Sequence, residues 1–132
     1  MAETTLQPSL MFIGDAQAAI DLYTRVFKDA EVIKLQRYDD TNPEMGGQIM
    51  QAEVRLQNQS LFFTDSPNVH SFDFTPSLSL FVTCSTAEEV DRIFHELSED
   101  GAVMMPLDAY PFSKRFGWCN DRFGVSWQVS LG

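Results

Sequence analysis

Two ten-residue stretches, AAIDLYTRVF at residues 18–27 and EEVDRIFHEL at residues 88–97, align without a gap and decide the fold. Apolar side chains recur in both at three- and four-residue steps, which predicts two amphipathic helices. In this alignment Ile20 falls over Val90, and Phe27 falls over Leu97. The chain therefore contains an internal repeat, and a repeat constrains a fold more than any single motif does.

Short segments that favour β-strands surround each helix in the same order. They cover residues 6–13, 31–38, 48–56 and 60–64 in the first half, and a strand opening at residue 76 with residues 102–107, 115–120 and 125–130 in the second. The sequence Pro8-Ser9-Leu10 recurs as Pro76-Ser77-Leu78 at the opening of each half. We expect one α+β domain over residues 1–132, with βαβββ halves at 6–65 and 76–131 and a connector at 66–75. Tandem halves of this kind form curved, mixed but mainly antiparallel sheets around a cavity.

The helix ends also have sequence signals. Asp15 is placed to cap the first helix. The second helix is predicted to begin with a capping box over Ser85-Thr86-Ala87-Glu88 and to end at Gly101 in a left-handed conformation.

Composition excludes several classes of partner. The formal net charge of −10 argues against a nucleic-acid partner and against an anionic membrane surface, because both would repel the chain. No apolar run approaches the roughly 20 residues that a membrane span needs. The N-terminal MAETTLQPS lacks the pattern of a signal peptide, and Cys84 and Cys119 lack metal-site spacing and suit a reducing compartment. We therefore expect a cytoplasmic protein with two free thiols.

The βαβββ tandem resembles the vicinal oxygen chelate superfamily, which includes glyoxalase I, extradiol dioxygenases and bleomycin-resistance proteins. The opening PSLMFIGDAQAAIDLYTRVF and the ending KRFGWCNDRFGVSWQV are similar to its PhnB-like branch, which is often labelled demethylubiquinone methyltransferase-like. The resemblance covers essentially the whole chain. It implies the glyoxalase/bleomycin-resistance fold and a homodimer.

The resemblance also implies four positions for metal ligands. They fall at Pro8 or Ser9, near Phe63, at Ser77 and at Gln128. Only Gln128 offers a suitable donor, whereas a catalytic metal site needs about three protein ligands. We therefore expect no metal and no cofactor. The methyltransferase label meets a separate objection, because the sequence lacks the GxGxxG turn of a Rossmann-type domain.

Strand alternation predicts the cavity face without reference to the family. Serines alternate with leucines in residues 77–80, and Ser126 and Gln128 alternate with Trp127 in the last strand. Two interpretations remain open: a solvated polar face without chemistry, or a small-molecule pocket. Our candidate ligand-binding residues are Ser9, Met11, Phe63, Ser77, Ser79, Lys114, Arg115, Trp118, Ser126 and Gln128.

Three further features belong to this hypothesis. Residues 108–115 carry aromatic and cationic side chains outside strand periodicity, so they form either a lid over the cavity or an ordinary solvated loop. Asp121-Arg122-Phe123-Gly124 predicts the turn of a β-hairpin. Glu53 is the candidate general base if its strand face points inward, since burial would raise its pKa; if the face points outward, Glu53 is a surface charge beside Arg55.

The sequence thus leads to a metal-free protein that binds a small organic molecule, with or without a reaction. The alternative is a sequestering protein of the bleomycin-resistance type that performs no catalysis. A third hypothesis is a structural dimer whose hollow is filled by side chains that include Phe63 and Met11. A metal-dependent lyase, dioxygenase or methyltransferase is the least favoured hypothesis.

Overall fold

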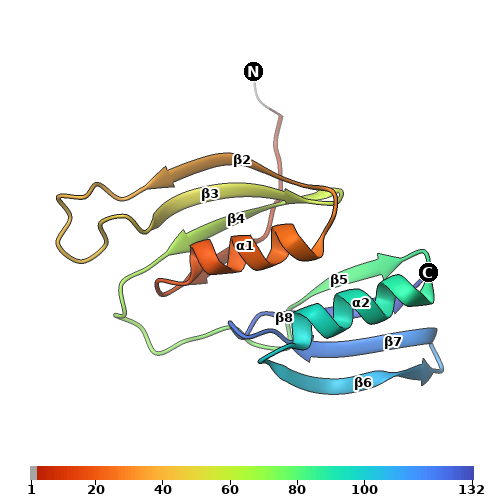
Figure 1. The fold of residues 1–132 in the computed structure, drawn as a ribbon. Helices are drawn as coiled ribbons and strands as arrows, with labels where there is room; N and C mark the ends of the chain where they lie inside the picture. The colour runs from red at the N-terminus through yellow and green to blue at the C-terminus, as the bar shows by residue number, and fades with distance from the viewer. Residues whose placement is uncertain (1–2) are drawn as a thin grey trace. The chain divides into compact units, whose positions relative to one another are not determined.

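The computed structural model describes residues 3–132 as two compact units that divide between His70 and Ser71, within the predicted connector. Each unit has the order βαβββ, as the repeat predicted (Figure 1). The N-terminal unit contains β1 (Ser9–Phe12), α1 (Ala16–Val26), β2 (Ala30–Arg37), β3 (Ile49–Leu56) and β4 (Gln59–Asp65). The C-terminal unit contains β5 (Ser79–Cys84), α2 (Ala87–Ser98), β6 (Ala102–Tyr110), β7 (Ser113–Asn120) and β8 (Ser126–Leu131).

In the N-terminal unit, α1 lies on one face of a sheet with strand order β1-β4-β3-β2. The pair β1–β4 is parallel and the other pairs are antiparallel. Phe63 is fully buried between the sheet and the helix, where its ring lies 5.9 Å from that of Phe12 and 5.9 Å from that of Tyr23. Burial of this aromatic group against the apolar stripe of α1 holds the unit together.

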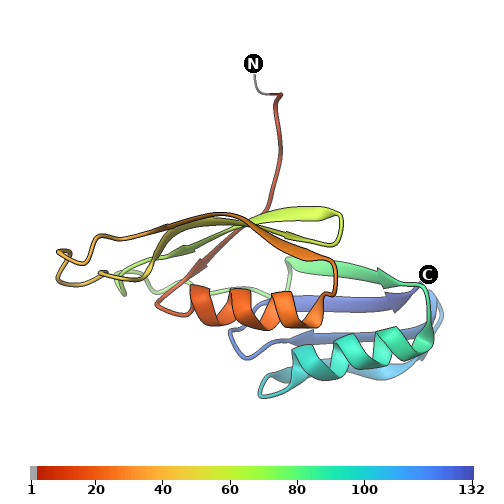
Figure 2. The same cartoon turned by 45° about the horizontal axis from the view of Figure 1, so that its top comes forward.

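The C-terminal unit repeats this arrangement with strand order β5-β8-β7-β6 and α2 on one face (Figure 2). Again the first strand pairs in parallel with the last, and the other pairs are antiparallel. Trp127 and Val129 of β8 are buried, as are Ile93, Phe94 and Leu97 of α2. The predicted turn after Asp121 is confirmed, with Gly124 at a positive φ of 90°.

The sequence offset between equivalent strand residues of the two units differs from the one predicted. Leu10 of β1 pairs with Phe63, and Leu80 of β5 pairs with Trp127, so equivalent strand residues lie 70 positions apart, as in the helices (80 − 10 = 70). The recurrence of Pro8-Ser9-Leu10 as Pro76-Ser77-Leu78 had implied a spacing of 68 (76 − 8 = 68), which is wrong for the strands. Ser77 is exposed in a turn, and Leu78 is 75% exposed instead of packing on the helix.

Three predictions of helix ends need correction. Asp15 is the N-cap of α1 but makes no side-chain cap within residues 3–132; the amide of Ala16 donates to Asp65 Oδ1 instead, at 3.0 Å. The capping residue of α2 is Thr86, whose hydroxyl accepts a hydrogen bond from the Glu89 amide. After α2 it is Asp100 that has the positive φ of 61°. Gly101 is needed for another reason, since a Cβ there would lie 2.1 Å from the Asn120 carbonyl oxygen.

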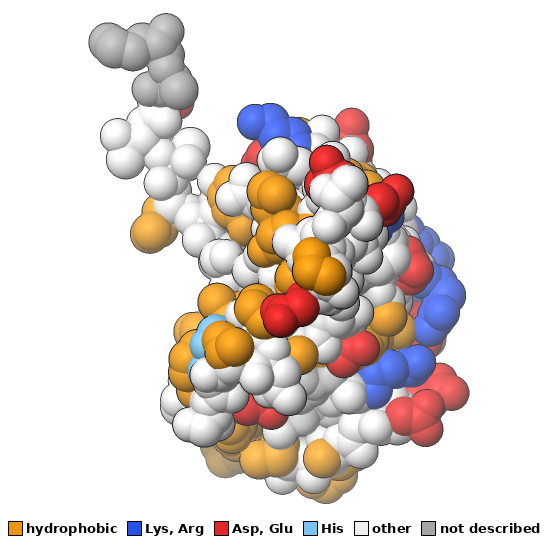
Figure 3. Space-filling model, turned by 90° about the vertical axis from the view of Figure 1, so that its left-hand side faces the viewer, with side chains coloured by type: hydrophobic (Ala, Val, Ile, Leu, Met, Phe, Trp, Pro, Cys, Tyr) orange, Lys and Arg blue, Asp and Glu red, His pale blue; other side chains and the backbone are white. Residues whose placement is uncertain are grey.

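The surface agrees with the acidic composition. Asp and Glu side chains are spread over the face drawn in Figure 3 rather than gathered in one patch. Neither described helix is long and apolar enough to cross a membrane.

Candidate functional site

The C-terminal sheet has one face covered by α2 and one face without a helix, which we call the helix-free face. Cross-strand pairing places alternate residues of β5, β7 and β8 on this face. They are Ser79, Phe81, Thr83, Phe116, Trp118, Asn120, Ser126, Gln128 and Ser130. The predicted residues Ser79, Trp118, Ser126 and Gln128 therefore lie together on one surface.

Gln128 occupies the middle of this face. Its strand neighbours on either side are Phe81 of β5 and Trp118 of β7. The side chain is half-buried and forms no hydrogen bond with any of residues 3–132. An amide with free donor and acceptor capacity thus lies between two aromatic side chains.

The hydroxyl groups around Gln128 are already paired with one another. Ser79 Oγ and Ser126 Oγ lie 2.7 Å apart, and the indole N–H of Trp118 donates to Ser126 Oγ at 2.8 Å. At the other end of β8, Ser130 donates to Ser113 Oγ at 2.9 Å. These contacts fix the Trp118 ring. Two polar side chains of this face keep unused bonding capacity: the half-buried amide of Gln128, and Asn120, whose buried Oδ1 has no partner among the described residues.

Residues 108–115 form neither the lid nor the solvated loop that the sequence left as alternatives, because this segment is a β-hairpin. Strand β6 runs to Tyr110, β7 begins at Ser113, and only Pro111 and Phe112 form the turn. Side chains that seemed aperiodic in the sequence belong to strands with register irregularities in this part of the β6–β7 pair.

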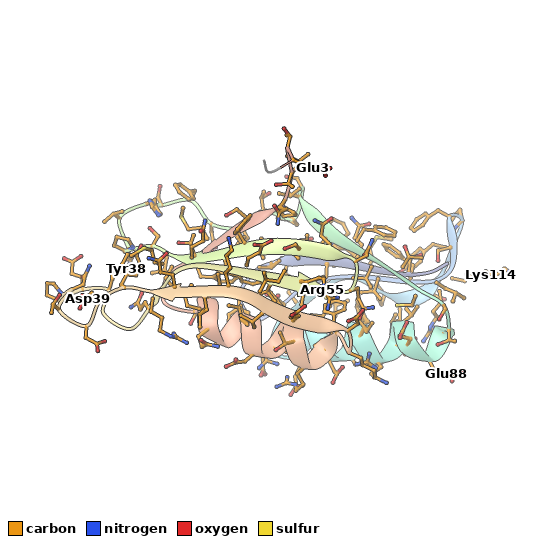
Figure 4. The ribbon with its side chains drawn as sticks, turned by 90° about the horizontal axis from the view of Figure 1, so that it is seen from above. Glu3, Tyr38, Asp39, Arg55, Glu88 and Lys114 are labelled. Carbon is orange, nitrogen blue, oxygen red and sulfur yellow. The ribbon has the colours of Figure 1, made fainter. Side chains whose placement is uncertain are left out.

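The two cations of that segment do not share one surface. The guanidinium of Arg115 donates to both carboxylate oxygens of Asp91 on α2, at 2.8 and 3.1 Å, so it lies on the helix side of the sheet. Hydrogen bonding to Arg115 lowers the pKa of Asp91, and the same contact raises the pKa of Arg115. Lys114 is exposed near the hairpin turn (Figure 4). Arg115, a candidate ligand-binding residue, therefore lies away from the helix-free face.

The N-terminal sheet confirms two predicted orientations and corrects a third. Ser9 and Met11 lie on the face without a helix, while Leu10 and Phe12 are buried toward α1. Phe63 was expected to face the cavity, but it is buried against α1. Alternation in β4 instead places Phe62 beside Ser9.

Glu53 also lies on the helix-free face of the N-terminal sheet, next to Phe62. Its Oε2 accepts hydrogen bonds from Ser60 Oγ at 2.7 Å and from Gln7 Nε2 at 3.0 Å. These bonds lower the pKa of Glu53, whereas the general-base hypothesis expected burial to raise it. A lowered pKa makes a carboxylate a weaker base, so this geometry does not favour the role.

The residues at the implied metal positions do not fit a metal ion. Phe63 has no donor atom and Ser77 lies in a turn, which leaves Ser9 and Gln128 on different sheets. Among residues 3–132, no three His, Cys, Asp or Glu side chains gather where they could hold a metal. We derive no chemistry through a metal.

A shallow cavity of about 180 Å³ lies elsewhere, in the N-terminal unit. It lies beside the start of α1 and the loop between β2 and β3, and its lining includes Gly14, Glu44, Gln48 and Ser66. None of the predicted site residues contributes to it.

Two buried aspartates have structural roles that were not predicted from the sequence, although Asp121 was expected to open a hairpin turn. Asp65 accepts hydrogen bonds from the amides of Ala16 and Ile49, both at 3.0 Å. Asp121 accepts from the amides of Phe123 and Val125 and from the indole N–H of Trp127, and so holds the β7–β8 turn. An aspartate directly after or at the end of an apolar strand is the signal that could have identified both.

Comparisons with known proteins agree with this architecture. The model of a family described as 3-demethylubiquinone-9 3-methyltransferase matches residues 4–130. A PhnB protein from Bacillus cereus, provisionally given the same description, is 46% identical, with 98% of this chain and 100% of that chain covered and a TM-score of 0.92. Protein PA1353 from Pseudomonas aeruginosa is 25% identical over 98% of both chains, with a TM-score of 0.83.

A more distant structure supports the fold alone. A glyoxylase/bleomycin resistance protein/dioxygenase domain from Frankia is 14% identical, with 99% of this chain and 93% of that chain covered and a TM-score of 0.67. No curated protein matches the chain. The predicted PhnB-like family and the α+β fold of βαβββ units are confirmed.

Proposed function

The chain belongs to the family described as 3-demethylubiquinone-9 3-methyltransferase, and we propose that this member binds a small organic molecule on the helix-free face of its C-terminal sheet. The observation that carries the proposal is the unpaired amide of Gln128 between Phe81 and Trp118. The side chain is half-buried, so its amide stays open to water, and a ligand can take over its donor and acceptor in exchange for that water. The proposal uses no step that depends on the methyltransferase name.

The chemistry of this face selects a planar ligand with its own donor and acceptor. A carboxamide offers one acceptor oxygen and an N–H donor side by side, so it forms two parallel hydrogen bonds with a lactam or another amide. The flanking ring of Trp118 is fixed by its bond to Ser126 and provides a flat apolar surface. Pockets that combine a few placed polar groups with aromatic walls are typical of small-molecule sites.

The second candidate function is sequestration without a reaction. It is favoured by the absence of ionisable side chains on this face within three described segments: β5, β8 and residues 116–120 of β7. A ligand held by amide, hydroxyl and aromatic groups meets no group there that exchanges protons at neutral pH. Mass spectrometry of the ligand after incubation separates the two functions: a changed mass indicates catalysis, and an unchanged mass indicates sequestration.

Native mass spectrometry of freshly purified protein tests the proposal first, because it reports a bound organic molecule and the oligomeric mass together. A homodimer, which we also propose, would appear in the same spectrum. For any ligand found, Gln128→Leu is expected to weaken binding at least tenfold. Gln59→Leu, the same change at an exposed position in the N-terminal unit, is expected to leave affinity unchanged.

Tryptophan fluorescence locates the ligand. Trp118 lies on the proposed face, whereas Trp127 is buried on the helix side. Ligand quenching should disappear in Trp118→Phe and persist in Trp127→Phe. Quenching that is lost only in Trp127→Phe, or binding that is equal in both glutamine variants, would contradict the proposed site.

A further inference from the structure

Four aromatic side chains extend the helix-free face from Gln128 to the β6–β7 hairpin turn. Phe81, Tyr110, Phe112 and Phe116 form this group, which we call the aromatic shelf. We propose that the shelf binds an aromatic arm of the same ligand whose planar polar group pairs with Gln128. The inference rests on the proposed function and specifies its ligand class: a two-part molecule with a hydrogen-bonding ring and an aryl substituent.

The shelf is held in a fixed geometry. The ring of Phe112 stacks on Tyr110 at 5.7 Å, with an interplanar angle of 11°, and meets Phe116 edge-on at 4.8 Å. The Tyr110 hydroxyl donates to the Pro106 carbonyl oxygen at 2.7 Å, which fixes the tyrosine ring. A surface ordered before binding loses little conformational entropy when a ligand arrives.

The shelf also exposes aromatic rings to solvent, although a β-hairpin does not need aromatic residues at its turn. Phe112 is 64% exposed and Phe81 is 58% exposed, although Phe116 beneath them is buried. Phe112 stands in a two-residue turn, where Gly, Asn and Asp are the residues that ease the backbone path. Exposed aromatic groups in contact with one another are typical of binding surfaces.

Phe81 connects the shelf to the amide. Its ring lies 6.4 Å from that of Phe116, and its residue is the direct strand partner of Gln128. The polar group and the apolar surface are therefore continuous. A ligand that used only the amide would leave the adjacent shelf in water, whereas an aryl arm would cover it.

The experiment compares 2-pyridone with 2-pyridones that carry phenyl, benzyl or phenethyl arms, and with a cyclohexyl analogue. Dissociation constants come from the quenching of Trp118 fluorescence. The best aryl arm is expected to bind about tenfold more tightly than bare 2-pyridone, the upper range for one aromatic contact, and more tightly than the cyclohexyl analogue. Phe112→Ala should remove most of this gain and leave the affinity for bare 2-pyridone unchanged.

Two variants control this result. Phe72→Ala removes another phenylalanine of equal exposure, 64%, and should leave every affinity unchanged. Gln128→Leu should weaken all the pyridones alike. Because Phe112 is exposed, its variant is expected to keep the melting temperature of the parent.

The outcomes separate the two proposals. If 2-pyridone binds through Gln128 and no arm improves on it, the shelf inference is overturned while the proposed function stands. If no pyridone shows binding that depends on Gln128, the two-part ligand is overturned together with the amide chemistry of the proposed function. If Phe112→Ala lowers the oligomeric mass, the shelf is a contact between copies of the chain and the inference is wrong.

Discussion

Replacing Asp121 with asparagine should destabilise the C-terminal unit, because one buried carboxylate holds three donors of the β7–β8 hairpin. Asp121 is buried, with only 2% of its surface exposed to solvent. Its Oδ1 accepts hydrogen bonds from the amides of Phe123 and Val125, at 2.9 and 3.1 Å, and its Oδ2 accepts from the indole of Trp127, at 2.9 Å. All three donors need an oxygen, and asparagine offers only one.

The size of the effect follows from these three contacts. If the asparagine oxygen stays with the two amides, its NH₂ group faces the indole N–H, so one hydrogen bond is lost and two donors are left opposed. A hydrogen bond to a charged group contributes about 1.5–3 kcal/mol, and an unsatisfied buried group costs about 1–3 kcal/mol. We therefore expect Asp121→Asn to lower the free energy of unfolding by about 3 kcal/mol. Asp121→Ala would leave all three donors unpaired and approach the whole stability of a small domain, about 5–15 kcal/mol.

Urea unfolding with linear extrapolation measures this difference. Far-ultraviolet circular dichroism and Trp127 fluorescence should be followed together, because the two units must unfold in one transition for a single free energy to apply. Asp108→Asn is the matched control. Its carboxylate is exposed and accepts one bond, from the next residue's amide at 2.8 Å, so a change below about 0.5 kcal/mol is expected.

The reasoning fails if Asp121→Asn stays within about 0.5 kcal/mol of the parent with an unchanged m-value. The same outcome would mean that Asp121 does not hold the β7–β8 turn as its hydrogen bonds indicate. A loss equal to that of Asp108→Asn would likewise mean that the buried contacts of Asp121 contribute no more than a surface bond does.

Three further predictions follow from other groups. Burial raises the pKa of Cys119 to about 12 and of Cys84 to about 11, so Ellman's reagent at about pH 8 should label neither thiol until denaturant is added; rapid labelling of native protein would contradict this. Gly117→Ala would place a Cβ 2.5 Å from the ring of Phe94 and should cost about 1–3 kcal/mol, and an unchanged melting temperature would refute the tight approach. The pKa of Asp91 is lowered from 3.8, so its stabilising effect is present above about pH 4 and is lost on acidification through the folded-state pKa. The difference in unfolding free energy between the parent and Asp91→Asn should therefore shrink from about pH 6 to about pH 3. A constant difference would be evidence against the ion pair.

The architecture was predictable because helix periodicity and strand alternation act locally. The positions of Leu10 and Phe12 toward α1, and of Ser9 and Met11 away from it, follow from a period of two. The repeat supplied the order of elements in both units. The error in the opening strand of the second unit arose because Pro76-Ser77-Leu78 copies the earlier tripeptide in sequence while the backbone begins its strand at Ser79.

The residues of the candidate site were harder to predict from the sequence, because they depend on which side chains pair across strands. The orientation of Phe63 was misjudged by one residue, and one residue is enough to change the face of a strand. Arg115 was placed in a candidate lid or solvated loop, since its bond to Asp91, 24 positions away, leaves no local sequence signal. The role of Phe81 could have been found by continuing the alternation from Ser79.

The two repeats use the same backbone positions for different chemistry. Met11 pairs with Thr64 in the N-terminal unit, and Phe81 pairs with Gln128 in the C-terminal unit, so Thr64 is the counterpart of Gln128. The Thr64 hydroxyl is satisfied, since it donates to the Met50 carbonyl oxygen at 2.7 Å. Gln128 has no such partner among the described residues. The fold constrains the helix-facing side chains in both units but leaves the helix-free faces to vary. Within residues 3–132, an aromatic shelf beside such an amide is found in the C-terminal unit alone. That asymmetry, rather than the shared architecture, is why we assign ligand binding to the C-terminal sheet.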